Sequence, residues 1–504
     1  MDLLNVTNSI NGVLWGTVMI VLCLGSAIYY TVRTRGAQFR LIGDMVGSLK
    51  KDQTSQSGIT PFQGFAMALG GRIGVGSIAG VATAIYYGGP GAVFWMWVYA
   101  FFGAATSFAE SVLAQIWKAD VNGEYKGGPA YYLRKTPLKF LGTLTAFFGI
   151  CAFGFTGPTV QAFNIADSFK NAFGLNTWIT GIALTLIFGV VVFGGMKRIG
   201  RFAEFAVPFM AGAYFLLTLI VLVVNAGAIP GMLVLIVKSA FNMESIYGGV
   251  FGSAIIWGVK RSLYSSEAGM GTGANAAASA EVSHPVKQGL AQAFSVYNTL
   301  IVCTCTALMI LVTGMFNVVD ASGEYIVHAL PNVEAGIGFT QAAIDVIMPG
   351  GNLGSIFLAV AIFFFAITTL LSFGFYAQVS ISAIFKNSRH LKLITAAVTL
   401  VQMFAIVFGS VKSAALAWNI ADIGVGILAW LNVIGLMFLA KPVVAALKDY
   451  ERQKKQGLDP VFRPSACGIE GAELWEDIAD NKYKHLNKKS LEDMTESTKS
   501  ADAT

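Results

Sequence analysis

Charged side chains inside long apolar runs are the residues of this sequence best suited to chemistry. Six of them stand within such runs or close to their ends: Arg72, Glu110, Asp167, Glu204, Glu267 and Asp422. A charge in this setting usually pairs with another charge or binds an ion or substrate. We expect Arg72 to pair with Glu110, Glu204 or Asp422, or to take the place of a bound cation. A purely structural salt bridge is an equally good interpretation.

The histidines and cysteines form no catalytic or metal-binding pattern. The four histidines are scattered along the chain, at positions 284, 328, 390 and 485. Cys303 and Cys305 would lie on different faces of a helix, which makes them poor joint ligands. The sequence has no zinc-ligand spacing, nucleophile–base arrangement or phosphate-binding loop. We interpret these histidines and cysteines as ordinary structural residues, and we expect neither enzyme activity nor an organic cofactor.

Glycines interrupt one of the apolar runs. Residues 70–91 read GGRIGVGSIAGVATAIYYGGPG, and eight of these 22 residues are Gly. Each Gly inside a helix costs about 1 kcal/mol relative to Ala. Close helix packing would explain Gly76 and Gly80, but not Gly70 and Gly71 followed by Arg72. We therefore expect the helix to unwind here, leaving backbone groups that must be satisfied by protein, water or a ligand.

A second run is interrupted in the same way. Residues 247–273 contain seven Gly, at positions 248, 249, 252, 258, 269, 271 and 273. Paired interrupted helices in corresponding positions of two halves indicate an inverted-repeat transporter with a site midway across the membrane. The half-helix N-termini would face a substrate carboxylate, and unwound carbonyls would bind a cation. The long segment 315–351 has no Lys or Arg and is expected to form an outer lid or an inert turn.

Composition places these elements in a membrane. Of the 504 residues, 55% are hydrophobic and 12% are charged, about half the charged share of soluble domains. This composition excludes a soluble enzyme and a disordered protein. Apolar runs long enough to cross a bilayer number about eleven and lie near 13–31, 62–87, 91–117, 139–168, 176–196, 203–225, 245–262, 287–314, 352–384, 391–410 and 415–440.

The charged residues predict two parts and an orientation. The segment 441–504 holds 23 of the 62 charged residues, so we expect a membrane part at 1–440 and a charged tail at 441–504. Alternate loops of the membrane part contain 19 and 3 basic residues, and the richer set includes Lys50, Lys51, Lys260 and Arg261. Positive loops mark the cytoplasmic side, which puts the N-terminus outside and the tail inside. The net charge of +6 then reflects a basic inner surface facing anionic lipid, with no need for a nucleic-acid partner.

Several motifs in this order resemble the alanine/glycine:cation symporter family, also called the sodium:alanine symporters. They are GVGSIAGVATAI (74–85), GGPGAVFWMW (88–97), SFAESVLAQIWK (107–118), GEYKGGPAYYL (123–133), GGMKRIGRFAEFAVPFMA (194–211), SLYSSEAGMGTG (262–273) and HPVKQGL (284–290). The resemblance covers roughly residues 10–445. It implies an all-α, polytopic, LeuT-type fold of five plus five inverted helices with discontinuous core helices 1 and 6. The first helix would be peripheral, and the ten-helix core would begin near residue 62.

The resemblance also implies an activity and a site. The activity is import of alanine or glycine, driven by Na⁺ as coupling ion, across a bacterial inner membrane. Site residues are carried over only where this sequence matches: Gly74, Val75, Gly76, Ser77, Gln161, Thr369, Leu370 and Phe373 for substrate, and Thr368 with Thr369 for Na⁺. Ser77 stands where the family usually has Asn, Ser372 where it has Gly, and Phe373 where it commonly has Trp. These differences leave glutamine open as the substrate, and coupling to protons remains the alternative to Na⁺.

Overall fold

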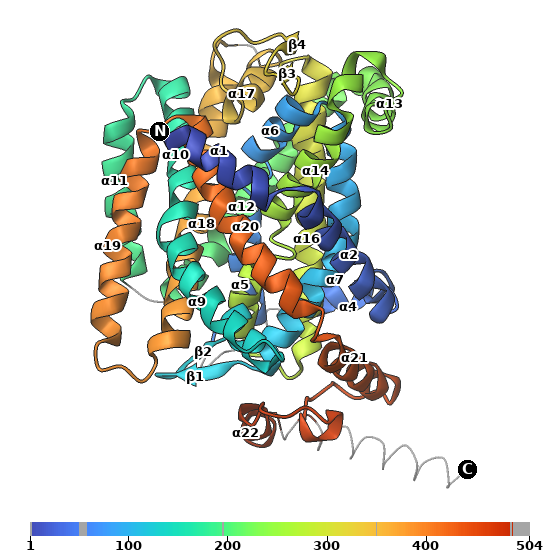
Figure 1. The fold of residues 1–504 in the computed structure, drawn as a ribbon, viewed down its shortest axis with the longest axis vertical. Helices are drawn as coiled ribbons and strands as arrows, with labels where there is room; N and C mark the ends of the chain where they lie inside the picture. Colours follow the sequence, from blue (N-terminus) through green and yellow to red (C-terminus); the bar gives the residue numbers. More distant parts are fainter. Residues whose placement is uncertain (1–2, 50–57, 194–195, 349, 484–485, 487–504) are drawn as a thin grey trace.

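The computed structural model describes residues 3–49, 58–193, 196–348, 350–483 and 486, and most of them form a bundle of helices (Figure 1). Lys50, Lys51 and His485 lie outside the described residues. The first half contains α1 (Leu3–Leu14), α2 (Thr17–Arg33), α3 (Ala37–Arg40), α4 (Ile42–Gly47), α5 (Pro61–Arg72), α6 (Ala79–Gly88), α7 (Gly91–Ile116), α8 (Pro129–Tyr132), α9 (Phe140–Cys151), α10 (Gly157–Phe173), α11 (Thr177–Val192), α12 (Met196–Val224) and α13 (Ile229–Ala240). The second half contains α14 (Phe251–Ser266), α15 (Thr272–Ser279), α16 (Pro285–Thr313), α17 (Ile337–Asp345), α18 (Leu353–Phe385), α19 (Leu391–Ser410), α20 (Ala414–Leu436), α21 (Ala440–Lys455) and α22 (Leu474–Asn481).

The protein is mostly helical and polytopic. Among the described residues, seven helices are long and apolar enough to cross a membrane: α7, α9 with α10, α12, α16, α18, α19 and α20. The pair α1 and α2, bent by 47°, makes an eighth. The other three predicted runs are shorter pieces. The run 62–87 contains the break between α5 and α6, and the run 245–262 lies just before the break between α14 and α15. The third is α11, which has 16 residues.

Two antiparallel hairpins lie at opposite ends of the bundle. The hairpin of β1 (Ala119–Val121) and β2 (Glu124–Lys126) lies near the tail, and the hairpin of β3 (Asn317–Val319) and β4 (Tyr325–His328) lies at the far end (Figure 1). The segment predicted as a lid thus contains β3, β4 and α17. We call the two ends of the bundle the tail end and the hairpin end.

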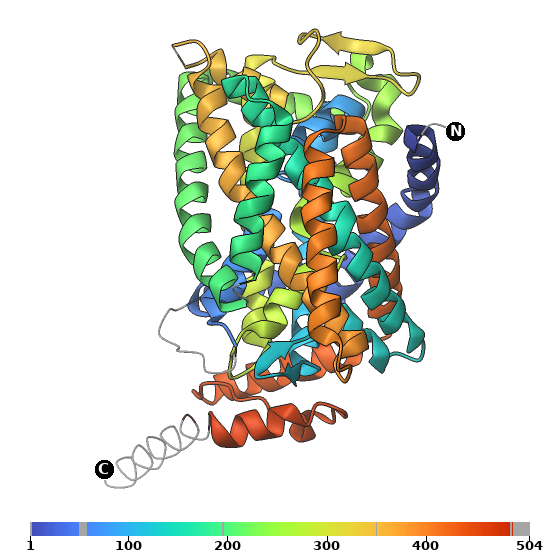
Figure 2. The ribbon, with the colours of Figure 1, turned by 90° about the vertical axis from the view of Figure 1, so that its left-hand side faces the viewer.

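The tail packs against its end of the bundle (Figure 2). Trp475 of α22 is fully buried, and its indole N–H donates to the carbonyl of Gln115 at 2.7 Å. The amide of Phe462 donates to the carbonyl of Ser283 at 2.9 Å, and the Ser283 hydroxyl donates to the carbonyl of Pro460 at 2.7 Å. These bonds fasten the tail to the end of α7 and to the segment that joins α15 to α16.

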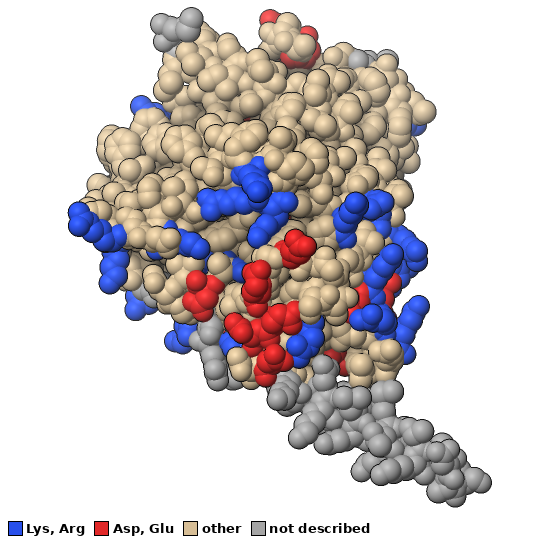
Figure 3. Space-filling view, turned by 60° about the horizontal axis from the view of Figure 1, so that its bottom comes forward, with Lys and Arg blue, Asp and Glu red and all other residues tan. Residues whose placement is uncertain are grey.

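Charged side chains gather around the tail end, whereas the flank seen above it is largely uncharged (Figure 3). This distribution agrees with the predicted asymmetry of the loops. The prediction was wrong for Lys260 and Arg261, which lie in α14 rather than in a loop and are both buried. They lie beside Asp422 of α20, and a neighbouring carboxylate is what allows cations to be buried.

Candidate functional site

The first helix interruption separates α5 from α6 over residues 73–78, which confirms the predicted unwinding. Gly74 has φ of +140°, and a Cβ placed there would lie 2.9 Å from the Cβ of Phe365. Only glycine combines this backbone conformation with so close an approach. The amides of Ser77 and Ile78 both donate to the Gly74 carbonyl, at 3.1 and 2.9 Å.

Free backbone amides occur in the first interruption, shortly before α6. Within the described part of the chain, the N–H groups of Gly74, Val75 and Gly76 donate to no protein acceptor. They precede Ala79, the first residue of α6, and unpaired amides before a helix are a general anion-binding feature. Free backbone amides of this kind are suited to binding a carboxylate.

The second interruption lies between α14 and α15, over residues 267–271. Its backbone is held by side chains from neighbouring helices. Glu110 of α7 accepts from the Gly269 amide at 2.9 Å, the Asn432 amide donates to the Gly269 carbonyl at 2.9 Å, and the Tyr99 hydroxyl donates to the Ala268 carbonyl at 2.7 Å. Irregular backbone at membrane depth requires such internal partners.

Arg72 connects the two interruptions. Its Nε lies 3.9 Å from Oε2 of Glu267, and both side chains are almost wholly buried. The guanidinium also donates to the Gln292 carbonyl at 3.0 Å, to the Ser107 hydroxyl at 3.1 Å, and to the Ser295 hydroxyl. The expected ion-pair partners were therefore wrong. Glu267 lies far from Arg72 in the sequence, so the sequence did not indicate that it would be the carboxylate beside Arg72.

The three carboxylates expected beside Arg72 have other partners. Glu204 accepts from the Gln63 amide at 3.0 Å, and Glu110 binds the second interruption. Asp422 accepts two hydrogen bonds from Arg261, both at 2.8 Å, and lies 2.6 Å from the Lys260 ammonium. A bidentate arginine–carboxylate pair fixes orientation as well as charge, so this cluster ties α14 to α20.

A small cavity of about 20 Å³ lies beside the two interruptions. Its polar lining comes from Gln161 and Tyr264, with Glu267 and the backbone of Gly71. Its remaining lining is mainly apolar: Ala152, Phe153, Met270, Phe373, Val425 and Leu428, with Thr156 and Gly157. A space of this size holds about one water molecule. The cavity has the mixed lining of a small-molecule site, a few polar groups facing an apolar wall.

The predicted substrate residues fall into two groups. Gln161 and Phe373 line the cavity, and the Gln161 amide lies 3.4 Å from the Tyr264 hydroxyl. The others do not line it: Gly74, Val75, Gly76, Ser77, Thr369 and Leu370. Tyr264 contacts both regions, because a Cβ at Gly76 would lie 3.1 Å from its ring. The Ser77 hydroxyl donates to the Arg72 carbonyl at 2.9 Å, and Leu370 belongs to the apolar core.

Sequence reasoning missed most of the apolar lining. The motif SLYSSEAGMGTG (262–273), whose glycines predicted an interruption, contains three residues of the cavity wall: Tyr264, Glu267 and Met270. Phe153 and Thr156 lie in a π-helical turn, Ala152–Thr156, which joins α9 to α10. Such turns often occur at functional sites, but nothing in the local sequence predicts this one.

The two predicted Na⁺ residues lie beside the end of α5. The Thr369 hydroxyl donates to the Gly70 carbonyl at 2.8 Å and to the Phe365 carbonyl at 3.1 Å. The Thr368 hydroxyl donates to the same Phe365 carbonyl at 2.7 Å. Two hydroxyls and two carbonyls therefore converge, and neutral oxygens of this kind suit a hard cation.

A larger hollow of about 720 Å³ opens at the hairpin end. Its lining includes Tyr87, Trp257, Arg261, Glu334 and Trp418. The ring of Trp418 lies 5.4 Å from that of Tyr264, between centroids, and Tyr264 also lines the small cavity. Aromatic side chains therefore separate the hollow from the cavity.

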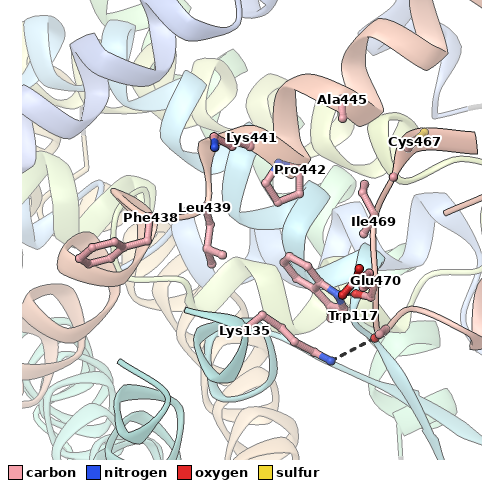
Figure 4. A pocket seen from close by; sticks show the side chains of 12 residues that line it. Trp117, Lys135, Phe438, Leu439, Lys441, Pro442, Ala445, Cys467, Ile469 and Glu470 are labelled. Carbon is pink, nitrogen blue, oxygen red and sulfur yellow. Dashed lines mark hydrogen bonds between the residues drawn. The ribbon is translucent and has the colours of Figure 1, made fainter. Parts of the chain in front are cut away.

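A further void of about 10 Å³ adjoins the small cavity and shares Phe153, Met270 and Leu428 with it. Another cavity, of about 570 Å³, lies at the junction with the tail, between Trp117, Phe438 and Ile469 (Figure 4). Its Lys135 donates to the Gly471 carbonyl at 3.2 Å. Since it includes no residue of either interruption, it is separate from the candidate site.

The chain is similar to known proteins over most of its length. Residues 1–464 match the sodium:alanine symporter family. The chain is 51% identical to the putative sodium/proton-dependent alanine carrier protein YrbD of Bacillus subtilis, over 95% of this chain and 98% of that one. It is 40% identical to the probable sodium/glutamine symporter GlnT of the same organism, over 95% and 97% of the two chains.

Among solved structures, the chain is similar to a substrate-bound, outward-open Na⁺-coupled sialic acid symporter. The identity is 11% and the TM-score 0.49, over 92% of this chain and 98% of that one. The family match spans both interruptions, the cavity and the threonine pair. This multi-pass protein therefore belongs to the sodium:alanine symporter family.

Proposed function

We propose that this protein imports a small neutral amino acid, alanine or glycine, by symport with Na⁺. The observation that carries the proposal is the small cavity beside two interrupted helices, with polar groups on one side and an apolar wall on the other. This cavity must enlarge to admit an amino acid. The apolar wall suits a methyl group or a hydrogen atom better than a charged side chain. The alanine carrier YrbD, at 51% identity, supports the same substrate.

The proposed substrate site combines the cavity with the first interruption. Gln161 and Phe373 contact the amino acid from the cavity wall, and the backbone of Gly74, Val75, Gly76 and Ser77 receives its carboxylate. Thr369 and Leu370 complete the site from α18. Because Tyr264 lies between the free amides and the cavity, its ring must move for both regions to contact one molecule.

The proposed Na⁺ site consists of Thr368, Thr369 and the carbonyls of Gly70 and Phe365. Both hydroxyls donate to carbonyls in this structure, and a cation among them would turn all four oxygens into ligands. Binding there would fix the end of α5 relative to α18. Ordering of the first interruption then raises substrate affinity, and linkage requires the substrate to raise Na⁺ affinity equally.

The proposed fold has eleven spans, a LeuT-type core of five plus five inverted helices that starts at α5, and a charged tail from residue 441. The interrupted helices would move with α7 and α16 against the remaining core, since α7 packs against both α14 and α16. We place the protein in a bacterial inner membrane, with the hairpin end outside and the tail end cytoplasmic. The collection of charged residues at the tail end supports this orientation.

Uptake by proteoliposomes tests the function. Purified protein is reconstituted, and labelled L-alanine uptake is measured with an inward Na⁺ gradient, an inward H⁺ gradient, or the two gradients opposed. We expect accumulation that follows Na⁺ and stops when choline replaces it. Uptake that follows the H⁺ gradient without Na⁺ would contradict Na⁺ coupling.

Glutamine is the second candidate substrate, because GlnT is 40% identical over nearly the whole chain. A competition panel of alanine, glycine, serine and glutamine, with both enantiomers where they exist, separates the candidates. We expect alanine and glycine to compete at the lowest concentrations. Competition by glutamine at lower concentrations than alanine would contradict the proposed substrate.

A further inference from the structure

Two buried acceptor atoms in the cavity wall have no hydrogen-bond donor. They are Oε1 of Gln161 and Oε2 of Glu267, and both residues are 2% exposed. Both side chains line the same small cavity. A buried acceptor without a donor costs about 1–3 kcal/mol, so two of them beside one cavity suit a bound molecule that carries donors.

Arg72 leaves this oxygen of Glu267 available. The two terminal nitrogens of the guanidinium donate to the Gln292 carbonyl and to the Ser295 and Ser107 hydroxyls. Its Nε, which has no hydrogen-bond partner among the described residues, lies 3.9 Å from the Glu267 oxygen. The distance is too long for a hydrogen bond but short enough for electrostatic attraction. Arg72 thus stabilises the position of the carboxylate without occupying its acceptor.

Gly71 makes room for the carboxylate at the cavity. A Cβ at this position would lie 3.1 Å from Oε1 of Glu267, closer than ordinary van der Waals contact. Without a side chain at Gly71, Glu267 can lie against the end of α5 and still line the cavity. The conformation of Glu267 itself, with φ of 54°, is uncommon for a residue with a side chain and directs the chain into the second interruption.

The opposite wall offers no hydrogen-bond acceptor from these side chains to an ammonium group. Phe153, Phe373, Val425, Leu428 and Met270 present apolar groups. A molecule with a charged amine at one end and a small apolar group at the other would match this polarity. Its amine supplies the donors that Gln161 and Glu267 lack, and its negative group would lie away from Glu267.

We propose that Glu267 is a substrate-binding residue whose carboxylate, together with the Gln161 amide oxygen, receives the ammonium group of the transported amino acid. This assignment rests on the proposed function and adds to it a requirement for a charged amine. It also orients the substrate, with the ammonium beside Glu267 and the side chain toward Phe153 and Phe373.

The first test uses the protein with its natural sequence. Proteoliposomes with an inward Na⁺ gradient take up labelled L-alanine in the presence of unlabelled L-alanine or L-lactate, which replaces the ammonium with a hydroxyl. We expect lactate to compete at least about 10-fold more weakly, the factor expected when a hydrogen bond to a charged group is lost. Equal competition by the two compounds would overturn the proposal.

The second test uses Glu267→Gln, which keeps the shape of the side chain and removes its charge. We expect the KM for alanine to rise about 10- to 100-fold, with a smaller preference for alanine over lactate. Glu244→Gln serves as the matched control, because Glu244 pairs with Lys238 at 3.4 Å, away from the cavity. An unchanged KM in Glu267→Gln would overturn the proposal.

A double variant separates substrate binding from a structural role. If Glu267 only neutralises Arg72, the charge-balanced Arg72→Gln/Glu267→Gln variant should recover both thermal stability and alanine KM. We expect recovery of stability without recovery of KM, so recovery of both would overturn the assignment. Failure of the unsubstituted protein to accumulate alanine with Na⁺ would instead contradict the proposed function. If no Glu267 variant folds, equal competition by lactate and alanine would still overturn the assignment.

Discussion

Arg72 and Glu267 hold opposite charges 3.9 Å apart where two interrupted helices meet, with both side chains buried. Arg72 ends α5, and Glu267 directly follows α14. Each interruption therefore begins at a charged residue that lies beside the charged residue of the other. A displacement of one half-helix relative to the other would separate a buried ion pair, which costs free energy unless another group replaces the lost partner.

Replacing Arg72 should destabilise the protein. In Arg72→Met, Glu267 keeps its charge without a neighbouring cation, and breaking a buried pair in this way typically costs about 3–5 kcal/mol. We expect a clear fall in Tm for protein purified in detergent. The Tm of Arg72→Lys should fall less, because lysine keeps the charge but loses part of the contacts to Gln292, Ser107 and Ser295. An unchanged Tm in Arg72→Met would contradict the importance of the pair.

Substitution of Gly74 should abolish transport, whereas substitution of Gly80 should not. Gly74→Ala places a Cβ 2.9 Å from that of Phe365 at φ of +140°, a strain of about 1–3 kcal/mol. A Cβ at Gly80 would have no neighbour closer than 3.6 Å. Alanine uptake at matched protein levels is the measurement. Normal uptake by Gly74→Ala would show that the open backbone at 73–78 is not required.

Removing the Thr369 hydroxyl should weaken Na⁺ binding. Thr369→Ala deletes one of the four proposed ligand oxygens, and we expect the Na⁺ concentration for half-maximal uptake to rise about 10-fold. Thr399→Ala is the matched control, since its buried hydroxyl donates at 2.9 Å to the Thr395 carbonyl of its own helix. If a Na⁺ titration gives the same curve for both variants, the proposed cation site is misplaced.

Truncation of Gln161 should weaken substrate binding more than it impairs folding. Gln161→Ala removes a cavity-lining amide that makes one long hydrogen bond, 3.4 Å to Tyr264. We expect about a 10-fold higher KM for alanine and a protein level close to that of the unsubstituted protein. Gln341→Ala, which breaks contacts to Ser168 and Ser355, should instead lower the protein level. A normal KM for Gln161→Ala would remove this residue from the site.

Docking of the tail should weaken as pH falls below about 6.5, the pKa of an unperturbed histidine. Nε2 of His284, just before α16, lies 3.4 Å from Oδ2 of Asp449 in α21. Burial lowers the pKa of His284 when the tail is docked. As the pH falls, His284 therefore takes up a proton more readily when the tail is undocked, and protonation favours that state. Burial acts to raise the pKa of Asp449, but His284, Gln453 and Arg452 together hold it below its ordinary value. The contribution of the Asp449 carboxylate to tail docking is therefore lost only at lower pH than that of His284.

Protease sensitivity measures this effect. Cleavage after α21, near Gln456–Leu458, should be faster at pH 5.5 than at pH 7.5, after normalisation to an unstructured peptide at each pH. His284→Gln should remove most of the difference, because it cannot take up the proton. Lys287 and Asp459, which form an ion pair nearby, remain unchanged in this comparison. Equal cleavage at both pH values would contradict the role of His284.

Local composition was sufficient to predict where the helices are interrupted. Gly74 and its neighbours make a continuous helix costly, and no distant contact is needed to reach that conclusion. The pair Thr368 and Thr369 was proposed as a Na⁺ site through a family resemblance, and that role stays a prediction. Lys260 and Arg261 were misplaced for a related reason: charges are expected at the ends of apolar runs, and only Asp422, from a distant helix, allows them to be buried.

What the sequence determined by itself was the membrane setting, the helical class and the two interruptions, because hydrophobicity and glycine content act locally along the chain. What only the tertiary structure decided was which groups meet. Arg72 lies beside Glu267 rather than Glu110, and Gln161 shares a cavity with Phe153. Such neighbours depend on how half-helices pack, and that packing is set by the summed contacts of the whole bundle rather than by any one segment.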